Sequence, residues 1–314
     1  MNKKMLAALT AVLLITPITA NAAIKNQSIA QQTPALAILD TALDTGLNVL
    51  PGRLIYEACI LDWNSCPNGK NFMEGPNSSL LPYSLITKNG FDHGTQMTSI
   101  AIANNPNMNI VFVRIIGATA SGVRQTASEA TVYRALDWVI ANKDRFNIQA
   151  VSMSQGRHDF PASLGANYCP NTPTTKSKIQ QLSSMGVATF FPAGNGRDYK
   201  RVDWPGCLED AVTIGATDQS DEITLYSNYD PLKIDFYALG NTQALSPGSA
   251  LKNVAGTSAA VQVAAAQWIA IKQAHPEYSY SQLIDLVSRT SKNTFNSKIN
   301  SAKLIDLKGA INGK

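Results

Sequence analysis

Residues 35–40 read Ala-Leu-Ala-Ile-Leu-Asp, five apolar residues that end in a single carboxylate, Asp40. A short continuous apolar run of this kind is typical of a strand that is buried on both faces of a sheet. Similar apolar, β-rich runs recur along the chain. We expect further strands at residues 109–116, 148–153, 187–191, 211–216 and 234–238.

Helical patterns fall between these strands. Residues 126–145 carry apolar side chains near helical spacing, and residues 174–185 stop at Gly186, a typical helix end. Strands that alternate with helices predict an α/β fold with a mostly parallel central sheet and helices on both faces. The other expected helices span residues 258–273, 279–291 and 302–307.

One domain over residues 23–314 is the simplest organisation, because no repeat, low-complexity tract or long linker divides the chain. The sequence has 314 residues, of which 45% are hydrophobic and 15% charged, and this balance excludes a disordered protein. The net charge of +4 comes from scattered basic residues, so nothing supports nucleic-acid binding.

The N-terminus has the pattern of a secretory signal peptide. Two lysines precede an apolar stretch over residues 5–18, and Ala20-Asn21-Ala22 fits the small-x-small rule, which predicts cleavage after Ala22. An uncleaved membrane anchor is the alternative, but the apolar stretch is shorter than the roughly 20 residues that a span needs. We therefore expect a secreted or periplasmic protein that has no membrane association after cleavage.

Four cysteines in an exported chain suggest disulfides. We favour Cys59–Cys66, which are close together in a turn-rich segment, and Cys169–Cys207, which would join two later loops. The other connectivities and free buried thiols remain open, and the spacing lacks the paired Cys-x-x-Cys of a zinc site.

Four polar residues stand where expected elements begin or end. Asp40 and Asn195 follow strands, His93 precedes an apolar helical stretch, and Ser258 opens an Ala-rich one. Each has an ordinary explanation, since Asp and Asn form turns and Ser caps helices. A helix N-terminus, however, favours a neutral histidine and places the Ser258 N–H where negative charge can develop. Together the four supply the nucleophile, base, orienting carboxylate and oxyanion donor of acyl transfer.

The sequence motifs around these residues resemble those of the subtilisin-like serine protease family, and the resemblance extends from about Pro34 to Ala310. Their order, Asp, His and then Ser, is the subtilisin order. The matching motifs are Ala37-Ile-Leu-Asp-Thr41, His93-Gly-Thr95, Ala193-Gly-Asn195 and Gly256-Thr-Ser258. Two subsidiary motifs, Ser152-Met-Ser-Gln-Gly156 and Tyr226-Ser-Asn-Tyr229, also match.

This resemblance implies a subtilisin-like fold and a serine endopeptidase with Asp40, His93 and Ser258 as its triad. Asn195 would complete the oxyanion hole. Ser152, Ser154, Gln155, Gly156 and Gly194 would bind a polypeptide substrate, with its backbone pairing along residues 152–156.

Several departures mark a distant member of the family. Ala42, Gln96, Ala259 and Gln262 replace a glycine, a histidine, a methionine and a proline of the family words, and none removes a catalytic group. Only residues 23–33 separate the signal peptide from the first strand, which is too short for a prodomain. We therefore expect folding without a covalent prosegment.

No cofactor is required for this chemistry. Structural calcium is common in the family, but we find no convincing ligand cluster in the sequence. A partner subunit and the side-chain preference of the substrate stay open, although Arg197 near Asn195 offers a weak case for acidic substrates. Two alternatives remain: a catalytically silent binding protein that keeps the protease fold, and a sedolisin-like acid peptidase, which His93 disfavours because that class uses Glu instead.

Overall fold

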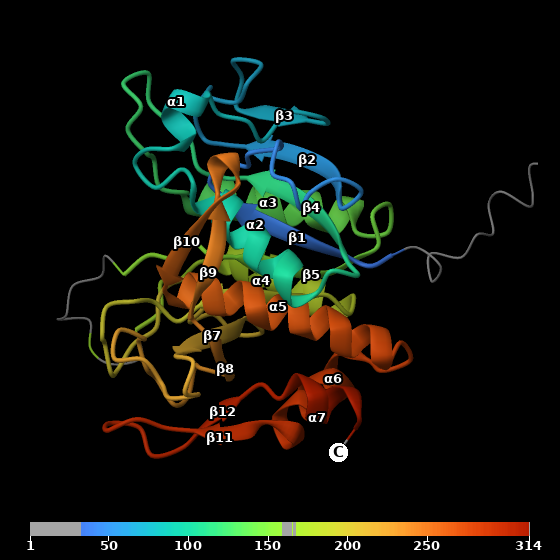
Figure 1. Ribbon diagram of the computed structural model, residues 1–314, viewed down its shortest axis with the longest axis vertical. Helices are drawn as coiled ribbons and strands as arrows, with labels where there is room; N and C mark the ends of the chain where they lie inside the picture. The colour runs from blue at the N-terminus through green and yellow to red at the C-terminus, as the bar shows by residue number, and fades with distance from the viewer. Residues whose placement is uncertain (1–32, 159–164, 166–167, 314) are drawn as a thin grey trace, which may run out of the picture. The chain divides into compact units, whose positions relative to one another are not determined.

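The computed structural model describes residues 33–158, 165 and 168–313 (Figure 1). The predicted signal peptide and its cleavage point lie outside these residues, and Thr33 onward forms one compact unit. The strands are β1 (Ala35–Asp40), β2 (Leu54–Ile60), β3 (Phe72–Glu74), β4 (Asn109–Arg114), β5 (Ile148–Met153), β6 (Ala188–Pro192), β7 (Val212–Thr217), β8 (Phe236–Leu239), β9 (Asn241–Ser246), β10 (Ala250–Ala255), β11 (Lys292–Thr294) and β12 (Ala302–Leu304).

Ten of these strands form one sheet in the order β11-β12-β8-β7-β6-β5-β1-β4-β2-β3. All pairs from β12 through β2 are parallel, whereas the edge pairs β2–β3 and β11–β12 are antiparallel. This arrangement confirms the expected α/β fold with a mostly parallel sheet.

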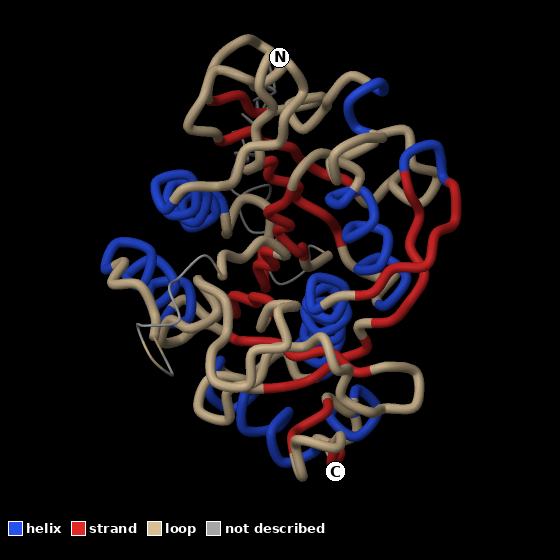
Figure 2. The backbone as a smooth tube through the Cα atoms, turned by 90° about the vertical axis from the view of Figure 1, so that its left-hand side faces the viewer, coloured by secondary structure: helices blue, strands red, loops and turns tan. Residues whose placement is uncertain are grey.

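Helices cover both faces of the sheet (Figures 1 and 2). Helices α2 (His93–Asn104) and α5 (Thr257–Ala274) pack together on one face, and α3 (Glu129–Asn142) and α4 (Pro173–Ser184) pack together on the other. Along β1 the side chains of Leu36 and Ile38 join the first core, and those of Ala37 and Leu39 join the second. This alternation explains why β1 is apolar throughout. The remaining helices are α1 (Tyr83–Ile86), α6 (Tyr280–Thr290) and α7 (Leu307–Ile311), with a 3₁₀ turn at Pro247–Ser249.

The expected helix over residues 302–307 is wrong. Residues Ala302–Leu304 instead form β12, which pairs with β11 and, through Leu304 and Tyr237, with β8. Helix α7 begins only after Asp306, whose Oδ1 accepts from Gly309 N at 3.1 Å as an N-cap. Sheet pairing thus determined the structure of a segment that is too short for helical periodicity to be decisive.

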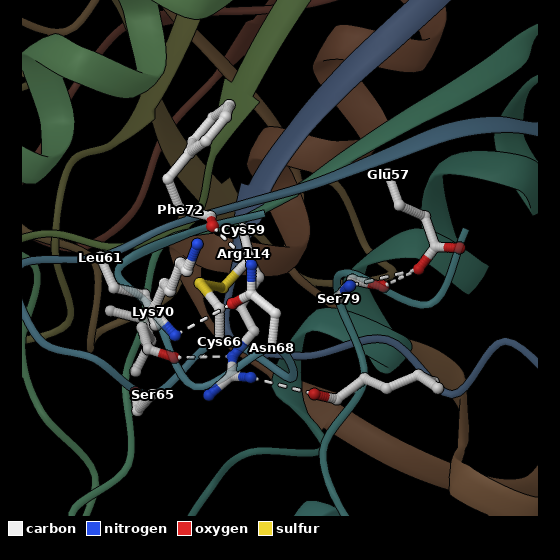
Figure 3. Close-up of a disulfide and its surroundings, with 12 residues drawn as sticks. Glu57, Cys59, Leu61, Ser65, Cys66, Asn68, Lys70, Phe72, Ser79 and Arg114 are labelled. Atoms are coloured by element: carbon white, nitrogen blue, oxygen red, sulfur yellow. Dashed lines mark hydrogen bonds between the residues drawn. A yellow bond between two sulfur atoms is a disulfide. The ribbon is translucent and has the colours of Figure 1, made fainter. Parts of the chain in front are cut away.

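Several strands were not predicted, namely β2, β3, β11 and the hairpin of β9 and β10. Strand β2 lacks a continuous apolar pattern because it contains Glu57, a buried carboxylate that accepts from the backbone N–H groups of Asn77 and Ser79 (Figure 3). Strands β9 and β10 form a separate two-stranded hairpin whose residues are mostly half-exposed or exposed. Neither pattern resembles a buried parallel strand, so hydrophobic periodicity could not detect them.

Both favoured disulfides are confirmed. Cys59 of β2 bonds to Cys66 with a Cα–Cα distance of 5.9 Å, and Cys169 bonds to Cys207 at 5.6 Å. Figure 3 shows the first bridge beside the buried Arg114, whose pKa burial lowers to about 10 and whose guanidinium donates to the carbonyls of Ile116 and Leu80. Within the described part of the chain, no helix has the length and apolarity to cross a membrane.

Strand order brings the predicted site residues to one edge. Strands β1, β5 and β6 are neighbours, and their carboxyl ends lead into Asp40, residues 154–156 and Asn195, respectively. In parallel α/β sheets this edge is where functional side chains gather. The amino ends of α2 and α5 bring His93 and Ser258 into the same region.

Candidate active site

Asp40 and His93 form a hydrogen-bonded pair. Asp40 ends β1 and is fully buried, while His93 opens α2 with 23% of its side chain exposed. His93 Nδ1 lies 2.8 Å from Asp40 Oδ1. A neutral imidazole that donates from Nδ1 keeps Nε2 as an acceptor, which is the tautomer that a general base needs.

Close backbone packing fixes this pair. The Thr41 hydroxyl donates to Phe91 O and accepts from Gly94 N, both at 2.8 Å, and so ties the end of β1 to the start of α2. A Cβ on Gly94 would lie 2.6 Å from Ala42 O and 2.8 Å from the Phe112 ring. Only glycine therefore permits α2 to approach β1 this closely.

Gln155 brings another donor to the pair. Its Nε2 donates to Asp40 Oδ1 at 3.0 Å and lies 3.2 Å from His93 Nδ1, while its Oε1 accepts from Arg124 Nη2. Asp40 Oδ1 also accepts from Thr41 N at 2.7 Å, whereas the buried Oδ2 has no partner among the described residues. The sequence motif predicted Gln155 as a substrate-binding residue. The structure places its side chain against the His93 imidazole and the Asp40 carboxylate.

Ser258 is the second residue of α5 and is half-buried. Its hydroxyl donates to Ser154 O at 3.1 Å, and the Ser154 hydroxyl donates back to Ser258 O at 2.9 Å. Among the described residues, Ser154 O is the hydrogen-bond partner of the Ser258 hydroxyl, and His93 is not. Ser154 and Gln155 are adjacent in the chain, so this one segment contacts both Ser258 and the Asp40–His93 pair.

Asn195 is anchored by its carbonyl oxygen. Oδ1 accepts from Thr257 N at 2.9 Å and from Thr257 Oγ1 at 3.0 Å. The amide nitrogen lies near Gly256. A Cβ added to Gly256 would lie 3.4 Å from Asn195 Nδ2 and 3.8 Å from Ser258 N. Asn195 Nδ2 and the backbone nitrogen of Ser258 therefore both lie close to Gly256.

Asn228 holds the loop that carries Asn195. Its fully buried side chain donates from Nδ2 to Ala193 O at 3.1 Å and accepts at Oδ1 from Gly196 N at 2.8 Å. Gly194 has a φ of +106°, and a Cβ there would lie 2.3 Å from both Asn228 Nδ2 and Asp203 Oδ1. The glycine is thus required by both backbone conformation and space. The motif that contains Asn228, Tyr226-Ser-Asn-Tyr229, was recognised in the sequence, but the role of Asn228 was not predicted.

A second histidine braces the same loop. His158 places Nδ1 2.7 Å from Asp203 Oδ1 and Nε2 3.2 Å from Asp198 Oδ2. Burial raises the pKa of Asp203 to about 6, against the opposing charge and hydrogen bond of His158. Both ring nitrogens face carboxylate oxygens, so His158 joins the two aspartates into one cluster. No pattern in the sequence indicates this cluster, because its members are separated by many residues.

The remaining predicted binding residues differ in exposure. The Ser152 hydroxyl is buried and donates to Gln262 Oε1 at 3.0 Å, so its side chain is closed to a peptide. Gln262 Nε2 donates to Ser154 Oγ at 2.9 Å. Gln262, which departs from the family motif, thereby links α5 to the segment that follows β5. Gly156 is exposed beside this link. Within the described ranges, no group of three or more His, Cys, Asp or Glu side chains is placed to hold a metal ion.

Comparison with known proteins identifies the family of this chain. The profile of the subtilase family matches residues 31–303. The chain belongs to the subtilase family. This subtilase is 26% identical over 244 residues to an alkaline protease of Alkalihalobacillus alcalophilus, and the match covers 74% of this chain but only 58% of that protein. It is also 26% identical over 244 residues to Subtilisin Savinase of Lederbergia lenta, of which it covers 82%.

Solved structures show that the fold is subtilisin-like. A protease of Pseudoalteromonas arctica matches with a TM-score of 0.70 at 19% identity over 90% of each chain. The prenylagaramide maturation protease PagA matches with a TM-score of 0.65 at 16% identity, over 94% of this chain and 98% of that one. At these identities the similarity establishes the fold of the subtilase and not its substrate.

Proposed function

We propose that this subtilase is a secreted serine endopeptidase that uses Asp40, His93 and Ser258 as its triad and Asn195 as an oxyanion donor. The observation that carries the proposal is a double anchorage. Asp40 orients His93, and Thr257, which precedes Ser258, anchors Asn195. Each hydrogen bond leaves free the atom that acyl transfer needs, which is Nε2 of the histidine and Nδ2 of the asparagine.

In this mechanism, the Ser258 hydroxyl attacks the peptide carbonyl while His93 Nε2 accepts its proton. Asp40 stabilises the imidazolium, and Asn195 Nδ2 with Ser258 N donates to the oxyanion. His93 then protonates the leaving amine, and water repeats the sequence to release the acyl group. The hydroxyl must first leave Ser154 O, which requires only a change between staggered rotamers of a half-buried serine.

The segment Gln155–Gly156 supports peptide binding. It follows the last paired residue of β5, and its backbone makes no hydrogen bond to any described residue. Unpaired N–H and C=O groups beside an active site can pair with an extended peptide as an added strand. Such pairing would place a scissile bond next to Ser258, because Ser154 already contacts that residue.

Labelling with a fluorophosphonate probe tests the nucleophile. We expect the purified protein to be labelled and to cleave a peptide library, and the Ser258→Ala variant to lose both. Ser288→Ala, a change at a distant serine on α6, is the matched control and should behave like the parent. Absence of labelling and cleavage in a correctly folded parent would instead favour a silent binding protein.

The pH profile separates the acid-peptidase alternative. A histidine base predicts activity that falls as His93 becomes protonated and that disappears in His93→Ala. Activity that peaks well below pH 5 and persists in His93→Ala would contradict the proposed triad.

Export is the second part of the proposal. It rests on the signal pattern before residue 23 and on two disulfides, which form in oxidising compartments. Intact-mass analysis of the exported protein should give an N-terminus at Ala23 and four oxidised cysteines. Recovery of the full chain with free thiols in the cytosol would overturn it.

A further inference from the structure

A small hollow lies beside the candidate active site. Gln155, which contacts Asp40 and His93, forms part of its wall together with Gly156 and Met153. Two cationic side chains, Arg124 and Arg157, also line it, and the rest of the wall is formed by Ile116, Thr126, Ala127 and Trp204. The hollow is therefore both adjacent to the reacting groups and lined by positive charge.

Arg157 is held in place without a charged partner. Its guanidinium stacks on the Trp204 ring at 4.6 Å from the centroid, and the two backbones exchange hydrogen bonds of 2.9 and 3.1 Å. Its Nε is buried and has no hydrogen-bond partner among the described residues. A buried donor without an acceptor is costly, so the guanidinium has donor capacity that no described residue uses.

Arg124 also lacks a carboxylate. Among the described residues its guanidinium donates to the amide oxygen of Gln155, and no Asp or Glu there forms an ion pair with Arg124 or Arg157. Asp203 packs against Gly156, but it is engaged by His158 and Asn228. By contrast, three other arginines each pair with an aspartate: Arg134 with Asp62, Arg201 with Asp198, and Arg289 with Asp285.

We propose that this hollow binds an acidic side chain, Glu or Asp, of the substrate. A peptide added along Gln155–Gly156 would direct alternate side chains to the same side, so one of them faces the hollow. Arginine presents a planar fork of donors that matches a carboxylate. The volume of about 40 Å³ suits such a group and is small for an aromatic ring, since a single water needs roughly 10–15 Å³.

Paired fluorogenic peptides test this specificity, which rests on the proposed peptidase function. Each pair differs only by Glu or Gln at one position, and the substitution is moved through four positions on either side of the cleaved bond. We expect the parent to prefer Glu at one position by about 10- to 100-fold in kcat/KM, as a hydrogen-bonded charge pair would give. Arg157→Met, which keeps an apolar stem against Trp204, should reduce that ratio to about 1–3, and Arg157→Lys should retain part of it.

Two further measurements keep the outcome clear. Arg197→Met removes an exposed arginine near Asn195 and should leave the ratio unchanged, whereas a loss there would show that surface charge alone sets the preference. Binding of the Glu peptide to the Ser258→Ala variant, followed by fluorescence anisotropy, reports recognition without turnover and should weaken with Arg157→Met. A ratio near 1 at every position, or one unaffected by Arg157→Met, overturns the acidic subsite. Failure of the parent to cleave any peptide refutes the peptidase itself.

Discussion

The two halves of the active site are held by different forces. The Asp40–His93 half depends on packing, with Gly94 pressed between the Ala42 carbonyl and the Phe112 ring. The other half, which we call the oxyanion loop (residues 193–203), depends on a hydrogen-bonded ionic cluster. Packing does not change with pH, whereas ionisable groups do. In the proposed site, the position of the base is therefore fixed by packing, whereas the loop that carries the proposed oxyanion donor is held by groups that titrate.

The largest effect should follow from Asn195→Ala. In subtilisin-type enzymes, loss of one oxyanion donor lowers kcat by about 10²- to 10³-fold, and we expect that loss here with little change in KM. Steady-state kinetics with a neutral peptide provides the measurement.

Asn195→Asp is the matched variant, because it keeps an oxygen for the Thr257 N–H while it removes the Nδ2 donor. If Asn195 only holds the loop, Asp should restore activity. If it donates to the oxyanion, Asp should be as impaired as Ala.

A smaller effect should follow from Gln155→Met on the packed half. The change removes a donor from Asp40 Oδ1, so the imidazole is less well oriented and kcat should fall by about tenfold with KM nearly constant. Steady-state kinetics with a neutral peptide measures the change.

Gln96→Met serves as its control. Gln96 is also a buried amide at the start of α2, but it donates to Asp92 and Ser246 and not to Asp40. A similar fall in kcat in this variant would show that loss of any nearby amide is sufficient, and the positioning role of Gln155 would then fail.

The same contrast shows how far the sequence could lead. Apolar runs predicted the parallel strands other than β2 and β12 to within about two residues, because burial on both faces leaves a clear pattern, as at β1 and β5. Local sequence motifs located Asp40, His93, Asn195 and Ser258, and the strand order then brought them to one edge of the sheet. The pattern failed at β12, where three residues become a strand only through pairing with β8 and β11.

The supporting contacts could not be predicted in the same way. The partners of His158 are 40 and 45 residues further along the chain, and only the folded loop brings them together. Gln155 lies within a motif that the sequence analysis recognised, but the direction of its side chain depends on Arg124 across the hollow. Long-range side-chain contacts of this kind leave no periodic signal in the sequence.

The smallest effect concerns stability and the oxyanion loop. Burial raises the pKa of Asp203 to about 6 from an ordinary value near 3.8, so the folded protein binds this proton more tightly than the unfolded chain does. Acidification from pH 6 to pH 4 therefore favours folding at this site, and that contribution is lost as pH rises through 6. Asp203→Asn should gain stability relative to its parent as pH rises from 4 to 7, by at most about 3 kcal/mol.

Urea unfolding in a Ser258→Ala background measures this change without self-digestion, and Asp198→Asn supplies the opposite sign. Burial alone would raise the pKa of Asp198, but hydrogen bonds from Lys200 N and Arg201 and the charges of Arg201 and His158 lower it overall. Its carboxylate therefore stabilises the fold above the unfolded pKa, and removing it should destabilise the protein at neutral pH, with the deficit vanishing on acidification. Parallel pH dependence in the two variants would contradict an ionic support for the oxyanion loop, because burial and ion pairing shift these two neighbouring carboxylates in opposite directions.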